Sequence, residues 1–120
     1  CTASNSALGL ASGSWVALMD QDDLLSEYAL CWMAQTISAN PSIQMIYSDE
    51  DKVDEFGNRH SPYFKCDWYR DLFYSQNMIS HLGVYNRELI ESIGGFKEGM
   101  EGSQDSQNIV ESLPLTKVCC

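Results

Sequence analysis

The sequence has little positive charge. Seven lysines and arginines stand against seventeen aspartates and glutamates, which gives the 120 residues a formal net charge of −10. Such a chain repels polyanions, so the composition argues against nucleic acid or an anionic membrane surface as a direct partner. A phosphate-bearing ligand would need a metal ion, or basic groups from outside this sequence, to offset its charge.

Long apolar runs and paired cysteine motifs are also absent. No run approaches the roughly 18 apolar residues of a membrane-spanning helix, and the first residues do not resemble a secretion signal. The five cysteines are odd in number and lack the C-x-x-C spacing of many zinc sites. We therefore expect reduced thiols in a cytoplasmic protein. The cysteines are Cys1, Cys31, Cys66, Cys119 and Cys120.

The most informative stretch is an apolar run that ends in carboxylates. Residues 15–19 are all apolar, and Asp20, Asp22 and Asp23 follow at once. A continuous apolar run predicts a strand that is buried on both faces, as in parallel sheets, where ligands lie beyond the carboxyl ends of the strands. Crowded carboxylates repel one another, and a hard divalent cation that also binds a substrate phosphate would relieve the repulsion. The alternative is a solvated acidic turn before the next helix.

Helix-like and strand-like segments alternate in the first half of the chain. Apolar spacing predicts helices over 3–12 and 27–39, the second with Ser26 as its N-cap, and strands over 14–19 and 43–47. Short connections in this order favour right-handed parallel crossovers. We therefore expect an α/β fold with a mostly parallel central sheet flanked by helices. Because the chain starts at Cys1, directly in helix-like sequence, we expect a domain that is cut at both ends.

The second half of the chain is less regular. Residues 48–66 form a long acidic stretch, in which Phe56-Gly57-Asn58 indicates a hairpin turn. Arg59 and Lys65 could contact a phosphate, although solvated surface positions are the simpler interpretation. The remaining predicted elements are helices over 68–76, 87–93 and 104–113 and strands over 79–85 and 115–120.

Several short motifs occur in order between residues 2 and 105. They are Asn5-x-Ala7-Leu8, Ala11-x-Gly13-x-x-Val16, Asp20-Gln21-Asp22-Asp23, Tyr47-Ser48-Asp49-Glu50-Asp51-Lys52, Pro62-Tyr63-Phe64-Lys65, Ser75-Gln76-Asn77, Gly94-Gly95-Phe96 and Gly99-x-Glu101-Gly102-Ser103-Gln104-Asp105. Together they resemble the middle of a family 2 (GT-A fold) glycosyltransferase. The likeness is greatest to bacterial enzymes that build O-antigen, rhamnan and other cell-surface polysaccharides.

The resemblance implies a fold and an activity. Residues 1–120 would be a partial GT-A (Rossmann-like) domain that lacks the amino-terminal half of the nucleotide pocket. The enzyme would transfer a sugar from a nucleotide-diphosphate sugar to a saccharide or lipid-linked saccharide acceptor, with inversion and with Mg²⁺ or Mn²⁺ as cofactor. It would lie in the cytoplasm or at the cytoplasmic face of the inner membrane, with any membrane association through segments outside this sequence.

The resemblance also implies roles for particular residues on the donor side. Asp20-Gln21-Asp22 resembles the D-x-D motif, so Asp20 and Asp22 would bind the metal ion and the donor. Asp23 and Asn5 would lie on the donor side as well, although Asp23 could equally serve the start of the next helix. Asp105 stands where inverting members carry the general base, and its alternative role is a helix cap.

Four further residues could lie on the acceptor side. Glu101 and Gln104 flank the position of the expected base, Asp105. His81 is a lone histidine among apolar neighbours, so a structural role is the competing interpretation. Trp68 could stack on a sugar ring, although core packing is the more ordinary role for a tryptophan.

Two alternatives to an active transferase remain. The aromatic, acidic and apolar pattern expected after Asp105 is replaced by Ser106-Gln107-Asn108-Ile109, which suits a degenerate or truncated, non-catalytic member. A binding module for divalent cations is the second alternative. As an EF-hand it has the wrong spacing, because a calcium loop starting at Asp20 would place Leu24 and Leu25 where a ligand and a glycine are required.

Overall fold

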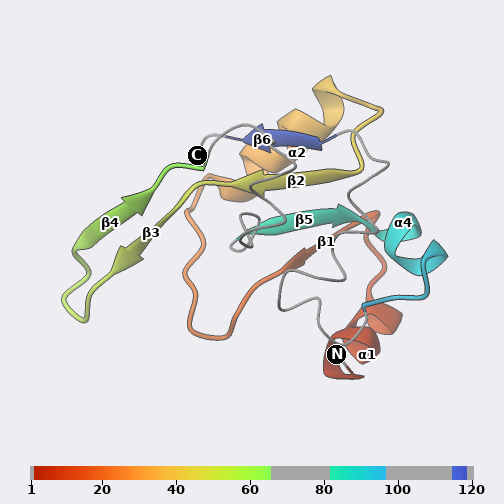
Figure 1. Ribbon diagram of the computed structural model, residues 1–120, viewed down its shortest axis with the longest axis horizontal. Helices are drawn as coiled ribbons and strands as arrows, with labels where there is room; N and C mark the ends of the chain where they lie inside the picture. Colours follow the sequence, from red (N-terminus) through yellow and green to blue (C-terminus); the bar gives the residue numbers. More distant parts are fainter. Residues whose placement is uncertain (1, 66–81, 97–114, 119–120) are drawn as a thin grey trace.

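The computed structural model describes residues 2–65, 82–96 and 115–118 (Figure 1). Six of the predicted elements are confirmed with small shifts at their ends, and the predicted strand over 79–85 is confirmed in its described part. The predicted helices over 68–76 and 104–113 lie outside the described residues. The observed elements are α1 (Thr2–Leu10), β1 (Trp15–Leu18), α2 (Ala29–Ala39), β2 (Met45–Ser48), β3 (Glu50–Val53), β4 (Arg59–Tyr63), β5 (Gly83–Asn86), α4 (Arg87–Ser92) and β6 (Leu115–Val118).

The expected mostly parallel, Rossmann-like sheet of a GT-A domain is wrong. The main sheet has the strand order β1-β5-β2-β6, and β5 runs antiparallel to both β1 and β2. Among the described strands only β2 and β6 pair in parallel, whereas β3 and β4 form a separate antiparallel pair. The physical reason is that β5 inserts between β1 and β2 and takes the hydrogen bonds that a direct crossover would have placed between them. Trp15 pairs with Asn86, and Ile46 pairs with Val84.

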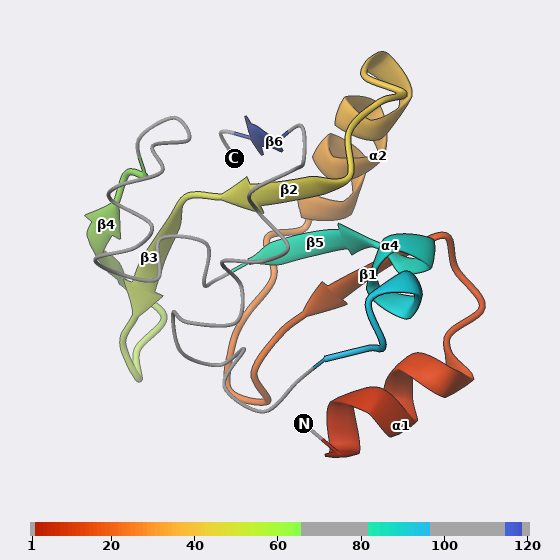
Figure 2. The same cartoon turned by 45° about the vertical axis from the view of Figure 1, so that its right-hand side comes forward.

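The main sheet has helices on both faces. Figure 2 shows α2 on one side of it and α1 and α4 on the other. Successive residues of a strand point to opposite faces, so Trp15 packs against the first core cluster and Val16 against the second. The first cluster contains Met33, Ile43, Ile46, Leu82 and Val84, and the second contains Leu8, Ile90 and Phe96. None of the described helices has the length and apolar character needed to cross a membrane.

Strand β1 is less buried than its apolar sequence predicts. Trp15 and Val16 are half-buried, but Ala17 and Leu18 are exposed, and Met19 after them is 43% exposed. The reason lies in the sheet order, because β1 is at one edge of the described sheet and only β5 pairs with it there. The prediction of burial on both faces therefore holds for the first half of the run and fails for the second.

Strands β3 and β4 form a β-hairpin that extends from the main sheet (Figure 1). The predicted turn is confirmed, with Gly57 in the left-handed region at a φ of 82°. The Asp54 carboxylate closes this turn by accepting hydrogen bonds from the backbone N–H groups of Phe56 (2.9 Å) and Asn58 (2.8 Å). These bonds, the one from the Asn58 backbone foremost, lower the pKa of Asp54. An ion pair of 2.6 Å between Arg59 Nε and Asp51 Oδ2 joins the two strands.

Candidate functional site

The carboxyl ends of β1 and β2 lie at the same edge of the main sheet. Both strands run antiparallel to β5, so they point in the same direction. In Figure 1 the β1–α2 loop and the hairpin leave the sheet at this common end. The chain places carboxylates directly after each strand, at Asp20, Asp22 and Asp23 after β1 and at Asp49 and Glu50 after β2. These five carboxylate residues, at the end of the sheet where β1 and β2 finish, are called the acidic edge below and form the candidate site.

The first group of carboxylates sits in a turn that its own residues close. The Asp23 N–H donates to the Asp20 carbonyl oxygen at 3.2 Å, and the Asp20 N–H donates to Asp23 Oδ2 at 3.3 Å. Asp20 and Asp22 are exposed, whereas Asp23 is half-buried. Helix α2 begins only at Ala29 and has no side-chain cap at Tyr28, so the prediction of Ser26 as its N-cap is wrong, and Asp23 does not cap that helix either. Asp23 stabilises the turn that presents the other two carboxylates to solvent.

In the described structure, no third side chain that could bind a metal ion gathers with the predicted metal residues Asp20 and Asp22. Over residues 2–65, 82–96 and 115–118, no three histidine, cysteine, aspartate or glutamate side chains gather closely enough to hold a metal ion. The donor set is nevertheless of the right chemistry, because exposed carboxylate oxygens are the ligands that Mg²⁺ prefers, and Mg²⁺ keeps several waters or substrate oxygens. A metal at this turn stays a prediction.

Asn5, predicted on the donor side, joins α1 to the segment after α4. Its Nδ2 donates to the Phe96 carbonyl oxygen at 2.7 Å, and its Oδ1 accepts from the Phe96 N–H at 2.7 Å. A Cβ at Gly95, where φ is 85°, would lie 2.7 Å from Asn5 Oδ1, so this close approach requires glycine. The structure thus shows a structural tether, and donor binding by Asn5 stays a prediction.

Replacing Asn5 with alanine separates these two roles. We expect Asn5→Ala to lower the free energy of unfolding by about 1–2 kcal/mol, because two hydrogen bonds are lost at a site that water partly reaches. Urea denaturation would measure the loss. Asn40→Ala is the matched control, since Asn40 Nδ2 makes one exposed bond to the Thr36 carbonyl, and it should cost less. The donor affinity of Asn5→Ala should be compared with that of the unmodified protein at a temperature well below the melting temperature of the variant. A lower affinity of the variant there would show that Asn5 also contacts the ligand.

The other predicted site residues lie outside the described residues. This applies to the expected base Asp105 and to the acceptor-side residues Glu101, Gln104, His81 and Trp68. Their roles stay predictions.

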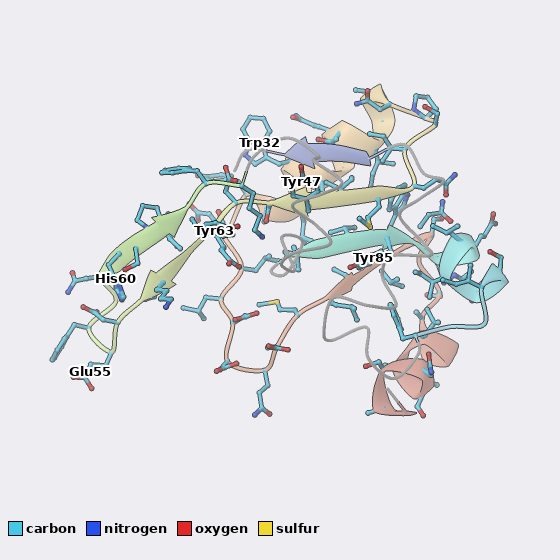
Figure 3. The ribbon with its side chains drawn as sticks, in the orientation of Figure 1. Trp32, Tyr47, Glu55, His60, Tyr63 and Tyr85 are labelled. Carbon is cyan, nitrogen blue, oxygen red and sulfur yellow. The ribbon has the colours of Figure 1, made fainter. Side chains whose placement is uncertain are left out.

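The solvent exposure of Lys65, which also lies at the acidic edge, differs from the prediction. A solvated surface lysine was the simpler expectation, but Lys65 is 2% exposed and its side chain is fully buried. It follows β4 at the base of the hairpin, where Figure 3 also places Tyr63, while Glu55 and His60 lie farther out. Its contacts include Asp49 and Glu50, which are distant in the sequence, and no local sequence pattern predicts that.

Comparison with known proteins identifies two similar sequences, while no family model matches the chain. The chain is 52% identical over 111 residues to the uncharacterized protein y4gI of Sinorhizobium fredii, a match that covers 92% of this chain and 12% of that protein. It is 36% identical over 102 residues to the O-antigen biosynthesis protein RfbC of Myxococcus xanthus, covering 85% of this chain and 8% of that protein. The chain therefore corresponds to a small part of each of these much longer proteins.

Proposed function

We propose that this chain belongs to an enzyme of cell-surface polysaccharide biosynthesis that transfers a sugar from a nucleotide-diphosphate sugar to a saccharide or lipid-linked saccharide acceptor. The observation that carries the proposal is the similarity to the O-antigen biosynthesis protein RfbC over 85% of the chain. The exposed turn at Asp20-Gln21-Asp22, at the carboxyl end of β1, supports it as the place for the donor.

The donor diphosphate needs positive charge at the acidic edge. Three carboxylates within four residues would repel a diphosphate, and the chain as a whole carries a net charge of −10. Mg²⁺ or Mn²⁺ held by Asp22, with Asp20 beside it, would offset that repulsion. When bound, the ion would stabilise the negative charge that develops on the departing nucleoside diphosphate. Asp23 would keep both side chains in place through its bond to the Asp20 N–H.

The transfer step itself requires a base on the acceptor side. In an inverting transfer the acceptor hydroxyl oxygen attacks the anomeric carbon, and the bond from that carbon to the diphosphate oxygen breaks, so its electron pair leaves with the nucleoside diphosphate. We assign Asp105 to take the hydroxyl proton. A carboxylate suits this role because the hydroxyl becomes acidic as the new bond forms.

The experiment that tests this function is sugar transfer by the full-length protein and its Asp105→Asn variant. We expect the variant to bind the donor almost normally and to turn over about a hundredfold or more slowly, which is the scale of losing a general base. Glu101→Gln tests the competing carboxylate and should retain most of the activity if Asp105 is the base. Turnover that survives in Asp105→Asn would reassign the base to another carboxylate such as Glu101, and no transfer by the unmodified protein from any nucleotide sugar would overturn the proposal.

A further inference from the structure

Lys65 is a fully buried cation in a strongly acidic chain. Its side chain has no exposed area, and the whole residue is 2% exposed. Lysine is almost never fully buried unless it is paired, because removing an ammonium group from water is costly. The buried ammonium group therefore needs compensating contacts. Because its burial is unfavourable, Lys65 is a candidate for a functional role.

Two of the contacts of Lys65 are with carboxylates in the segment that leaves β2. The Lys65 backbone N–H donates to Asp49 Oδ1 at 2.7 Å, and Lys65 Nζ lies 3.8 Å from Glu50 Oε2. The same Nζ lies 6.0 Å from the centroid of the Tyr63 ring, within the range of a cation–π contact. The backbone at residue 65 thus binds Asp49, and the Lys65 side chain pairs with the next carboxylate, Glu50.

This segment is also fixed to the main sheet. The Ser48 N–H donates to the Leu82 carbonyl oxygen at 3.2 Å, immediately before Asp49. The Leu82 N–H in turn lies 3.4 Å from Ser48 Oγ. Ser48 is hydrogen-bonded to Leu82 and Lys65 lies at the base of the hairpin, so Asp49 and Glu50 between them have little freedom to change orientation.

The chemistry of these carboxylates indicates which part of a donor they would contact. Carboxylates repel a diphosphate but accept hydrogen bonds from hydroxyl groups. Asp49 and Glu50 are half-buried at the acidic edge, and they follow β2 rather than the exposed turn after β1. Residues that suit hydroxyl groups therefore lie at the same end of the main sheet as the turn proposed for the metal and the diphosphate.

We propose that Lys65 is a positioning residue whose side chain orients Glu50, next to Asp49, so that the two carboxylates accept hydrogen bonds from the sugar hydroxyls of the donor. This inference rests on the proposed function, because it presumes that a nucleotide sugar binds at the acidic edge. It assigns recognition of the sugar to the base of the hairpin, and recognition of the diphosphate to the turn at Asp20–Asp23.

The test compares Lys65→Met with Lys52→Met in the full-length protein. Methionine approximates the volume of lysine and leaves no unpaired cation behind, while Lys52 is an exposed lysine on β3 of the same hairpin. The probes are UDP-, GDP- and dTDP-sugars and the matching nucleoside diphosphates, measured by calorimetry with Mn²⁺. We expect Lys65→Met to weaken binding of the nucleotide sugar by tenfold or more and to leave binding of the nucleoside diphosphate unchanged. Lys52→Met should change neither, and Lys65→Arg should restore part of the loss.

A purely structural lysine would give a different result. Lys65→Met would then lower the melting temperature, but well below that temperature it would bind sugar and diphosphate like the unmodified protein, and this outcome overturns the inference. Hydrogen exchange of residues 49–56 gives a readout that needs no ligand, and it should be faster in Lys65→Met than in Lys52→Met. If the unmodified protein binds no nucleotide sugar, the proposed function and the sugar contact both fail. Unchanged exchange would separately refute the positioning.

Discussion

Asp22→Asn in the full-length protein is expected to abolish Mn²⁺-dependent binding of the nucleotide sugar, with a rise in Kd of about two orders of magnitude or more. The amide keeps the shape of the side chain but removes the negative charge that would hold the cation. Losing one partner of a close charge pair commonly costs about 2–5 kcal/mol, which corresponds to this scale. Calorimetry with and without Mn²⁺ measures the effect.

The control for this prediction is Asp23→Asn. The Asp23 carboxylate accepts a hydrogen bond from the Asp20 N–H, and an asparagine oxygen can still accept it. We therefore expect the control to lose much less affinity. Full donor affinity in Asp22→Asn would remove the metal role of this residue. Tight Ca²⁺ binding without any nucleotide would instead favour the alternative of a cation-binding module.

Ile90→Ala is expected to lower the free energy of unfolding by about 3–4 kcal/mol. Ile90 is 0% exposed in α4, and it forms the second core cluster with Leu8 and Phe96. Truncating a buried isoleucine to alanine removes buried methyl groups and leaves a cavity, and the measured range for such changes is about 2–5 kcal/mol. Urea denaturation followed by tryptophan fluorescence provides the measurement.

Leu10→Ala supplies the matched control for Ile90→Ala. Leu10 belongs to α1, the other helix on this face of the sheet, but it is 88% exposed. Its truncation should change the unfolding free energy by less than about 0.5 kcal/mol. Similar losses in the two variants would mean that α1 and α4 do not pack on the sheet as described.

Local sequence patterns predicted the elements but not how the strands pair. Helix α2 follows from the apolar spacing of Ala29, Met33 and Ile37, and the hairpin turn follows from Gly57. Both signals lie within a few residues. The insertion of β5 between β1 and β2 has no such signal, because the sequence of a short apolar strand does not specify which strands it pairs with or whether it pairs parallel or antiparallel. The fold class was wrong for this reason.

The same distinction between local and distant contacts applies to the candidate site. The turn at Asp20–Asp23 could be placed at the end of a strand because its carboxylates directly follow the apolar run. The exposure of Leu18 and the burial of Lys65 could not be predicted, since each depends on segments distant in sequence. The edge position of β1 exposes Leu18. Lys65, which follows β4, is buried and pairs with Glu50 at the start of β3.

The position of β5 in the main sheet also has a consequence for the order in which the chain folds. β1 and β2 leave the ribosome well before β5, yet each pairs with β5 and not with the other. Until residues 83–86 arrive, the two earlier strands lack this common partner, and a large loop must close before Trp15 can meet Asn86. The β3–β4 hairpin needs only local contacts. Pairing β5 with β1 and β2 therefore closes much longer loops, at a greater cost in chain entropy, than pairing β3 with β4.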